Sequence, residues 1–396
     1  MNWIRGLTLV FVAVLFVDSD RAASVDIRLG TILPSGTPQH KLLLELNERW
    51  RKDSAGGVKL TVFPDGRLGD EAEMVGKIRT RQINAGLFSA VGLSEIDSGV
   101  TGLQVMPMMF RSWDEVDYVR DKMRPMLESR LRAKGCVVLF WADAGWVRFF
   151  SKMPAVTPDD FRKTKLFAWE GNDSQIELMR SLGFQPVPSA ATDVVLGLST
   201  NRFNAVPLPP LVALAIQMQK HAPHMLELNW TPIVGAAIIR ADVWEKIPPT
   251  DRATLQAAAD ITGGKFRKVG RGDNDDAITA MRKSGLQAHP LKVEDEKEWQ
   301  TLAAELRPKV RGRLVPPDIF DGVEKHLRDF RVETTITDER GPERGKVDLP
   351  HFKPPISTEA LQLALVLAAL VLIPTAEFLL RTYMTRTAKK PDRDIE

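Results

Sequence analysis

The stretch VDIRLGTILPSGTPQHKLLLELNERWRKDSAGGVKLTVFPDG, residues 25–66, decides the fold class. Its first part, Val25–Leu33, alternates apolar with polar residues, as a half-buried strand does. Pro38–Asp53 then carries apolar residues at helical spacing, and Val58–Phe63 is a second strand that a Pro-Asp-Gly turn stops. A strand, a helix and a strand in this order are typical of an α/β protein with a mostly parallel sheet.

The same alternation continues to about residue 330 and predicts an α/β fold throughout. Two such halves, joined by crossing strands, would enclose a cleft. Further strands are predicted at Ile83–Ser89, Cys136–Trp141, Trp146–Phe150, Lys165–Trp169, Phe203–Pro207, Met225–Asn229 and Gly235–Ile239. Further helices are predicted at Gly69–Thr80, Trp113–Lys134, Asp173–Leu182, Ala191–Ser199, Pro210–His221, Pro249–Ser284, Val293–Arg313 and Asp318–Phe330.

The composition is that of a soluble globular body. The 396 residues suffice for two domains, and 44% are hydrophobic and 27% charged. The net charge of +3 is small and no basic stripe with interleaved aromatics is present, so we expect no nucleic-acid partner. The single cysteine, Cys136, lies in an apolar run, and we expect it to be a buried small hydrophobe rather than a reactive thiol.

No constellation of residues indicates catalysis. Of six histidines only His221 and His224 are close, and Pro223 between them breaks helical geometry, so we expect no metal site. The chain contains no G-x-S-x-G, P-loop or G-x-G-x-x-G motif. We therefore expect a protein that is not an enzyme and uses no cofactor.

The N-terminal segment has the features of a secretory signal. Arg5 precedes an apolar run over residues 7–17, which is too short to cross a bilayer, and small residues follow at 22–24. Residues 1–24 are therefore predicted to be a signal peptide cleaved after Ser24. The alternative is a retained, uncleaved anchor.

The C-terminal segment predicts a membrane helix. Residues 360–376 read ALQLALVLAALVLIPTA, and basic residues follow from Arg381 onward. We expect a transmembrane helix at residues 359–381, a cytoplasmic tail at 382–396 and a flexible linker at 331–358. This topology holds the body outside the inner membrane, in the periplasm. The alternative is a buried core helix of a soluble domain.

Motifs along the body, in order, carry a resemblance to a known family. They are LPSGTP (33–38), FPDGRLGDE (63–71), MPMMFRS (106–112), TPDDF (157–161) and LGFQPVP (182–188). Residues 25 to about 330 resemble the substrate-binding subunit, of DctP type, of the tripartite ATP-independent periplasmic (TRAP) transporters.

The resemblance implies a two-lobed periplasmic-binding-protein fold of type II, with a long helix that spans both lobes. Lobe 1 would comprise residues 25–146 with about 232–270, and lobe 2 residues 147–231 with about 286–330. The lobes would close on a small molecule and deliver it to small and large TRAP membrane subunits. The segment 372–381 also resembles the first membrane helix of the small subunit.

Two departures from the family pattern concern the ligand. Where the family has an arginine in a K-x-R segment that pairs with a substrate carboxylate, this chain has Phe167, and Trp169 lies on the same strand face. In the later stretch the family's polar ligand-facing residues correspond to Val206, Pro207 and Leu208. We therefore expect a cleft more apolar than is usual in the family.

The candidate ligand-binding residues are Phe167, Trp169, Arg148, Trp146, Asn204, Val206 and Leu208. The resemblance implies that Arg148 matches a family position that often contacts anionic ligands. For the aromatic residues the alternative is core packing, and for Arg148 it is a structural ion pair.

Three hypotheses about function follow. The first is a TRAP-type receptor for an apolar or mixed ligand. The second is a membrane-anchored ligand sensor or scaffold that uses the same fold. The third is a carboxylate receptor that uses Arg148.

Overall fold

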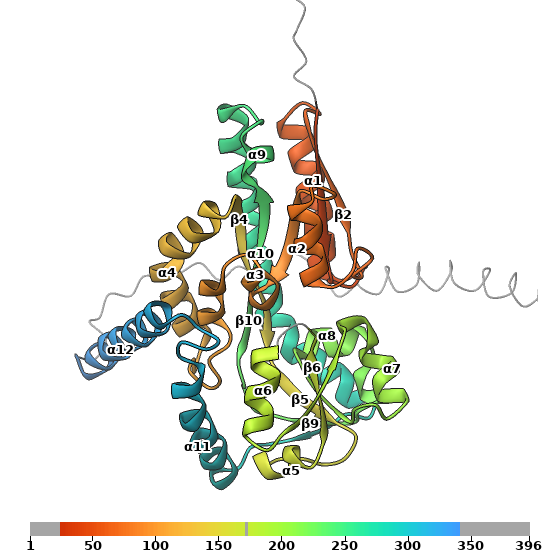
Figure 1. Cartoon of the computed structure of the whole chain (residues 1–396), viewed down its shortest axis with the longest axis vertical. Helices are drawn as coiled ribbons and strands as arrows, with labels where there is room; N and C mark the ends of the chain where they lie inside the picture. The colour runs from red at the N-terminus through yellow and green to blue at the C-terminus, as the bar shows by residue number, and fades with distance from the viewer. Residues whose placement is uncertain (1–23, 171–172, 341–396) are drawn as a thin grey trace, which may run out of the picture. The chain divides into compact units, whose positions relative to one another are not determined.

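Two β-sheets form the framework of the computed structural model, which describes residues 24–170 and 173–340 (Figure 1). The first sheet has the order β2-β1-β3-β10-β4 and the second β11-β9-β5-β8-β6-β7. The described residues up to Ile336 belong to one compact unit, and each sheet is the centre of one lobe of that unit. The two-lobed α/β fold predicted from the strand–helix alternation is confirmed.

The first sheet is parallel at one edge and antiparallel at the other. Strands β1, β2 and β3 are parallel, whereas β10 runs antiparallel to both β3 and β4. The bounds are Val25–Thr31 (β1), Val58–Phe63 (β2), Ala85–Ser89 (β3), Cys136–Trp146 (β4) and Pro232–Arg240 (β10). The second sheet contains Arg148–Ser151 (β5), Lys165–Trp169 (β6), Gln185–Ser189 (β7), Ala205–Leu208 (β8), His224–Leu226 (β9) and Gln287–His289 (β11).

The helices of the first lobe follow its strands. They are Pro38–Asp53 (α1), Glu71–Arg79 (α2), Ala90–Ser94 (α3), the 3-10 turn Ser98–Leu103 (η1), Trp113–Ala133 (α4) and Ala241–Trp244 (α9). Thr37 begins α1 by accepting a hydrogen bond from the backbone N–H of His40, and Pro38 suits the first helical position. The apolar face of α1 ends at Trp50, whose indole N–H donates to the carbonyl of Leu255 at 2.9 Å.

The second lobe has shorter helices. They are Pro158–Arg162 (α5), Asp173–Ser181 (α6), the turn Ala191–Asp193 (η2), Val194–Ser199 (α7), Pro210–Ala215 (α8) and the turn Met218–Lys220 (η3). The helices α10 (Pro249–Lys283), α11 (Val293–Val310) and α12 (Pro317–Arg340) complete the chain.

Helix α10 is the long helix that the resemblance predicts. Its 35 residues pack on α1 and β4 in the first lobe and on α8 in the second. Gly270 permits the close approach to β4, because a Cβ there would lie 1.9 Å from the carbonyl oxygen of Asp143.

The lobes are joined where strands pass from one sheet to the other. Only Val147 separates β4 from β5, and residues 227–231 separate β9 from β10. At this crossing the ladder between β4 and β10 has a bulge, and Gly145 has a φ of +106°, a conformation that favours glycine. The crossing strands therefore have the local geometry of a hinge.

Helix α12 corrects two predictions. The sequence placed residues 286–330 in the second lobe, but α12 packs on α4 of the first, with the rings of Tyr118 and Phe330 5.1 Å apart (Figure 1). The sequence also began the linker at Arg331, whereas α12 continues to Arg340. Arg331 is held there because its Nε donates to Glu115 at 2.7 Å, a long-range contact that no local pattern reveals.

The predicted membrane-associated segments belong to the two ends of the chain. Residues 1–23 of the predicted signal, the linker from residue 341, the membrane helix 359–381 and the tail 382–396 lie outside the described residues. Within the described ranges, no helix has both the length and the apolar composition that crossing a bilayer requires.

Candidate solute-binding site

A cavity of ≈ 180 Å³, here called the outer chamber, is lined by residues of both lobes. The first lobe contributes residues from α2, α3 and η1, and the second contributes Trp169, Glu170 and Ser189–Ala191. Trp169 and Ser189 end the parallel strands β6 and β7. In α/β sheets the carboxyl ends of parallel strands are the usual place for ligands, so this cavity is the leading candidate for the site.

The buried carboxyl group of Glu71 shapes one wall of the outer chamber. It accepts hydrogen bonds from the backbone N–H and the hydroxyl of Ser89, at 2.7 and 2.6 Å, and from the N–H of Gly92 at 3.1 Å. Burial raises the pKa of Glu71 although these hydrogen bonds oppose the rise. Glu71 thus ties the start of α2 to the start of α3 at the edge of the cavity.

The polar lining of the outer chamber contains groups of both signs. Arg313 donates to Glu177 at 2.7 Å, while Asp70, Glu95 and Glu170 add carboxylates to the wall. The Ser189 hydroxyl is buried and has no hydrogen-bond partner among the described residues. A buried hydroxyl left without a partner is costly, so a ligand atom that bonded it would be favoured.

A second cavity of ≈ 150 Å³, here called the inner chamber, adjoins the first. The two share Val91, Val105, Trp169 and Leu314 in their walls. The rest of the inner wall is mostly apolar and comes from β6, α6, α11 and the crossing strands, with Phe149, Trp230 and Trp299 as its large aromatic residues. Phe149 stacks on Trp299 with ring centroids 5.4 Å apart.

Phe167 and Trp169 both border the inner chamber, and Trp169 also borders the outer one. Phe167 is fully buried and packs edge-on against Trp169 and Phe203, each at 5.3 Å between centroids. It therefore belongs to the core of the second lobe as well as to the chamber wall. The position of Phe167 is thus compatible both with the predicted ligand contact and with the core-packing alternative.

Val206 and Leu208 are buried in that same core and are not among the residues that line the two chambers. Between them Pro207 pairs with Phe149 and lines the inner chamber. Neighbouring residues of a strand point to opposite faces of the sheet. In β8, therefore, Pro207 and its neighbours Val206 and Leu208 cannot all face the cavity. Of the three residues that the resemblance indicated in this stretch, Pro207 lines the inner chamber and its two neighbours are buried in the core.

The side chain of Asn204 bonds the backbone and lines neither chamber. Its side-chain oxygen accepts from the N–H of Lys165 at 2.8 Å, and its own N–H donates to the Lys165 carbonyl at 2.9 Å. It precedes β8, at the end of the strand away from the chambers. Asn204 therefore connects the beginning of β6 with the beginning of β8.

Arg148 and Trp146 lie next to the lobe crossing, and neither is among the lining residues. Arg148 is the ladder partner of Leu208 in the second sheet, and its Nε is buried and without a partner among the described residues. Burial lowers the pKa of Arg148, and the charges of Glu227 and Asp275 oppose this. Trp146 packs on Trp113, with ring centroids 4.9 Å apart.

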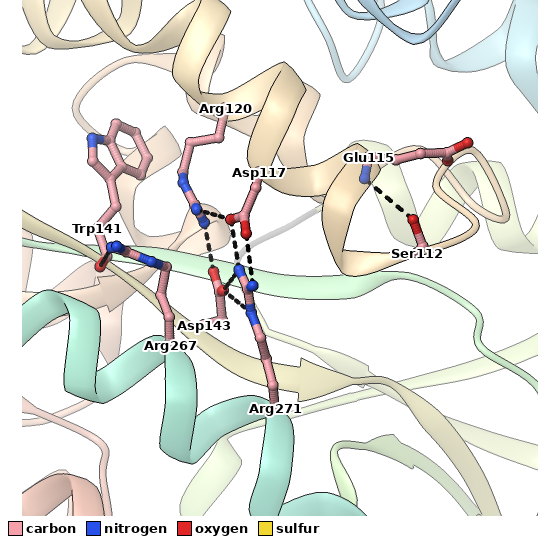
Figure 2. A network of polar contacts seen from close by, with 8 residues as sticks. All are labelled: Ser112, Glu115, Asp117, Arg120, Trp141, Asp143, Arg267 and Arg271. Atoms are coloured by element: carbon pink, nitrogen blue, oxygen red, sulfur yellow. Dashed lines mark hydrogen bonds and ion pairs between the residues drawn. The ribbon is translucent and has the colours of Figure 1, made fainter. Parts of the chain in front are cut away.

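An ion-pair network holds α4, β4 and α10 together at the crossing (Figure 2). The buried carboxylate of Asp143 accepts from Arg120 at 3.0 Å and from Arg271 at 2.9 Å. Asp117 on α4 also pairs with both arginines. Burial alone would raise the pKa of Asp117, but the hydrogen bond from Arg271 and the charges of Arg120, Arg271 and Arg267 lower it.

Several of the lining residues carried no separate signal in the sequence. Trp230, Trp299 and Arg313 come from segments far apart in the chain and meet only in the fold. Glu71 lies inside the motif FPDGRLGDE, so the resemblance indicated its region but not its role. Within residues 24–170 and 173–340, no group of three or more histidine, cysteine or acidic residues could hold a metal ion.

Comparison with known proteins gives the family. The model of the bacterial extracellular solute-binding proteins, family 7 (DctP), matches residues 29–311. The C4-dicarboxylate-binding periplasmic protein DctP of Rhodobacter capsulatus is 24% identical over 298 residues, which cover 74% of this chain and 88% of that protein. The 2,3-diketo-L-gulonate-binding periplasmic protein of Escherichia coli is 24% identical over 270 residues, 67% of this chain and 81% of that one.

Solved structures share the fold. A TRAP periplasmic solute-binding protein of Ralstonia eutropha with bound 2-acetolactate has a TM-score of 0.72 at 16% identity, covering 77% of this chain and 99% of its own. One from Shewanella oneidensis with bound succinate has a TM-score of 0.71 at 17% identity, covering 77% and 100%. With the family match over residues 29–311 and two lobes that meet at a cavity, the chain belongs to the DctP family of bacterial extracellular solute-binding proteins.

Proposed function

We propose that this chain is the receptor of a TRAP-type transporter, which captures a small molecule between its lobes and delivers it to membrane subunits. The observation that carries the proposal is the outer chamber, whose wall comes from α2 and α3 of one lobe and from the ends of β6 and β7 of the other. A ligand there contacts both lobes at once. Contacts made only when the lobes are together favour the closed state.

We propose further that the ligand is an organic acid. The relatives are named for C4-dicarboxylate and 2,3-diketo-L-gulonate, and two of the similar structures hold succinate. Arg148, next to the inner-chamber residues Val147 and Phe149, supports an acid, because its buried Nε has no hydrogen-bond partner among the described residues. A buried cation is stabilised by an anionic partner.

The third element of the proposal is a membrane anchor at residues 359–381. It is supported by the uncharged run at 360–376 and by the basic residues that follow it. An anchored receptor would meet its membrane subunits at an effective concentration on the order of mM, without free diffusion.

A panel of solutes tests the receptor function. The full chain in lipid nanodiscs is heated with small organic acids, with their neutral amides and with neutral sugars. Because a ligand that binds only the folded state raises the melting temperature, at least one acid should raise it and its amide should not. Binding of neutral solutes alone would contradict the acid, and a panel without any shift would contradict the receptor.

A further inference from the structure

The inner chamber has a wall whose polar groups are already satisfied. The indole N–H of Trp299 donates to the carbonyl of Val156 at 2.8 Å. The hydroxyl of Thr231 donates to the carbonyl of Gln104, and the side-chain oxygen of Gln104 accepts from the N–H of Val234 at 3.2 Å. These groups therefore need no ligand atom as a partner, and the surface left for a ligand is apolar.

The volume of the inner chamber is large for a packing defect. Protein interiors are packed to the density of organic crystals, with few voids larger than a water molecule. The inner chamber measures ≈ 150 Å³. An apolar cavity of about this volume stays dry and binds benzene, so a ring or a chain of about six carbons would fill it.

The position of the inner chamber connects it with the site already described. Val91, Val105, Trp169 and Leu314 belong to both walls, so the two chambers are direct neighbours. The outer chamber, by contrast, carries Arg313, acidic side chains and the unpartnered Ser189 hydroxyl. A more polar and a mostly apolar cavity thus lie on either side of these four residues.

We infer that the ligand is amphipathic: an organic acid whose aromatic or alkyl group of about six carbons fills the inner chamber. This inference rests on the proposed receptor function and specifies its substrate class. It distinguishes the ligand from short dicarboxylates and sugar acids, which have no apolar group to bury.

A homologous series measures the inner chamber. Straight-chain monocarboxylates from acetate to decanoate, and phenylacetate, are titrated into the full chain in nanodiscs, with empty nanodiscs as the blank. Each buried methylene should increase affinity about fourfold until about six carbons are buried, after which the affinity should level off. An affinity that does not depend on chain length would overturn the inference.

Two variants locate the effect. Ala168→Leu places about three extra carbons at the wall of the inner chamber. The increase in affinity with chain length should therefore stop about three methylenes earlier. Val91→Phe adds bulk at the shared wall of the two chambers and should weaken binding of the long acids at least tenfold. The control is Ala142→Leu in the first sheet, where the alanine has the same 6% exposure and lines neither chamber.

The outcomes separate this inference from the proposed function. If short polar acids bind and chain length has no effect, the receptor function stands and the amphipathic ligand is wrong. If Ala168→Leu, folded as judged by its melting curve, leaves the series unchanged, the apolar group is not in the inner chamber. If no solute of any class binds, the receptor function fails and the inference fails with it.

Discussion

Strand alternation decides which residues of a matching motif can meet a ligand. In β8, Pro207 lines the inner chamber while Val206 and Leu208 are buried in the core behind the sheet. In β6, by contrast, the consecutive residues Leu166, Phe167 and Ala168 all border the inner chamber, and Phe167 also packs on Phe203 in the core. A substitution that looks like a loss of ligand contacts can thus also be a change in core packing.

Arg148, the proposed partner of the ligand's acid group, also has a cost in stability. Its Nε is buried without a partner among the described residues, and burial lowers its pKa. A buried charge that lacks a partner destabilises the folded state, and function often preserves such groups.

Arg148→Met should therefore raise the melting temperature by roughly 2–4 °C, equivalent to about 1 kcal/mol, because it removes the desolvated charge. The same variant should bind organic acids at least tenfold more weakly, since the proposed anionic partner is lost. Calorimetric titration and thermal melts check both effects. Arg311→Met is the control, because Arg311 pairs with Asp321 at the surface and lines neither chamber. Equal losses in the two variants would contradict the role of Arg148.

Helix α10 packs against β4 more closely than a side chain would allow. A Cβ at Gly270 would lie 1.9 Å from a backbone oxygen of β4, whereas a Cβ at Gly264 in the same helix would have nothing within 4 Å. The two glycines share the helix but differ in what faces them.

Gly270→Ala should lower the free energy of unfolding by roughly 1–3 kcal/mol, because α10 must move away from β4. Gly264→Ala should raise it by about 0.5–1 kcal/mol, since alanine favours the helix and meets no neighbour. Urea unfolding of both variants gives the comparison. If both substitutions shifted stability in the same direction, the close contact at Gly270 would not control the packing.

The ion pairs between α4, β4 and α10 predict sensitivity to acid. The pKa of Asp117 is lowered in the folded state, so the folded protein binds fewer protons than the unfolded chain at low pH. The stabilisation from Asp117 is fully present above the ordinary pKa of its carboxyl group, about 3.8. It is lost as the pH falls through the lowered pKa that Asp117 has in the folded protein.

Urea unfolding between pH 6 and pH 3 tests the contribution of Asp117 and its ion pairs to stability. The stability of the unmodified protein should fall steeply at the acid end, and Asp117→Asn should flatten the decline. Asp321→Asn serves as the control, because its pair with Arg311 is exposed to solvent and should contribute less. A profile as steep in Asp117→Asn as in the unmodified chain would exclude this network as the cause.

At the scale of the whole molecule, the lobes are joined at the β4–β5 and β9–β10 crossings and by α10. The bulge near Gly145 lies where β4 leaves the first sheet, and the network of Asp143 and Arg271 holds α4, β4 and α10 together beside it. Closure about these connections would bring the two walls of the outer chamber together.

The proposed anchor predicts where the protein is found in a fractionated cell. Deleting residues from Ala360 onward should release the receptor into the soluble fraction, because the apolar run at 360–376 is removed. A deletion of 382–396 alone keeps that run and should stay with the membranes. A truncated protein that still pelleted with membranes would refute the anchor.

The sequence by itself determined the α/β class, the family and the long helix, because periodic apolar residues and ordered motifs are local properties. The resemblance also indicated Phe167, Trp169 and Pro207, which lie in the chamber walls of the structure.

Only the tertiary structure decided which strand faces meet a cavity, that α12 returns to the first lobe, and that Trp230, Trp299 and Arg313 complete the two chambers. These facts depend on contacts between residues far apart in the chain, such as Arg331 with Glu115, and on the space that packed side chains leave between them. Local periodicity predicts neither these long-range contacts nor the cavities.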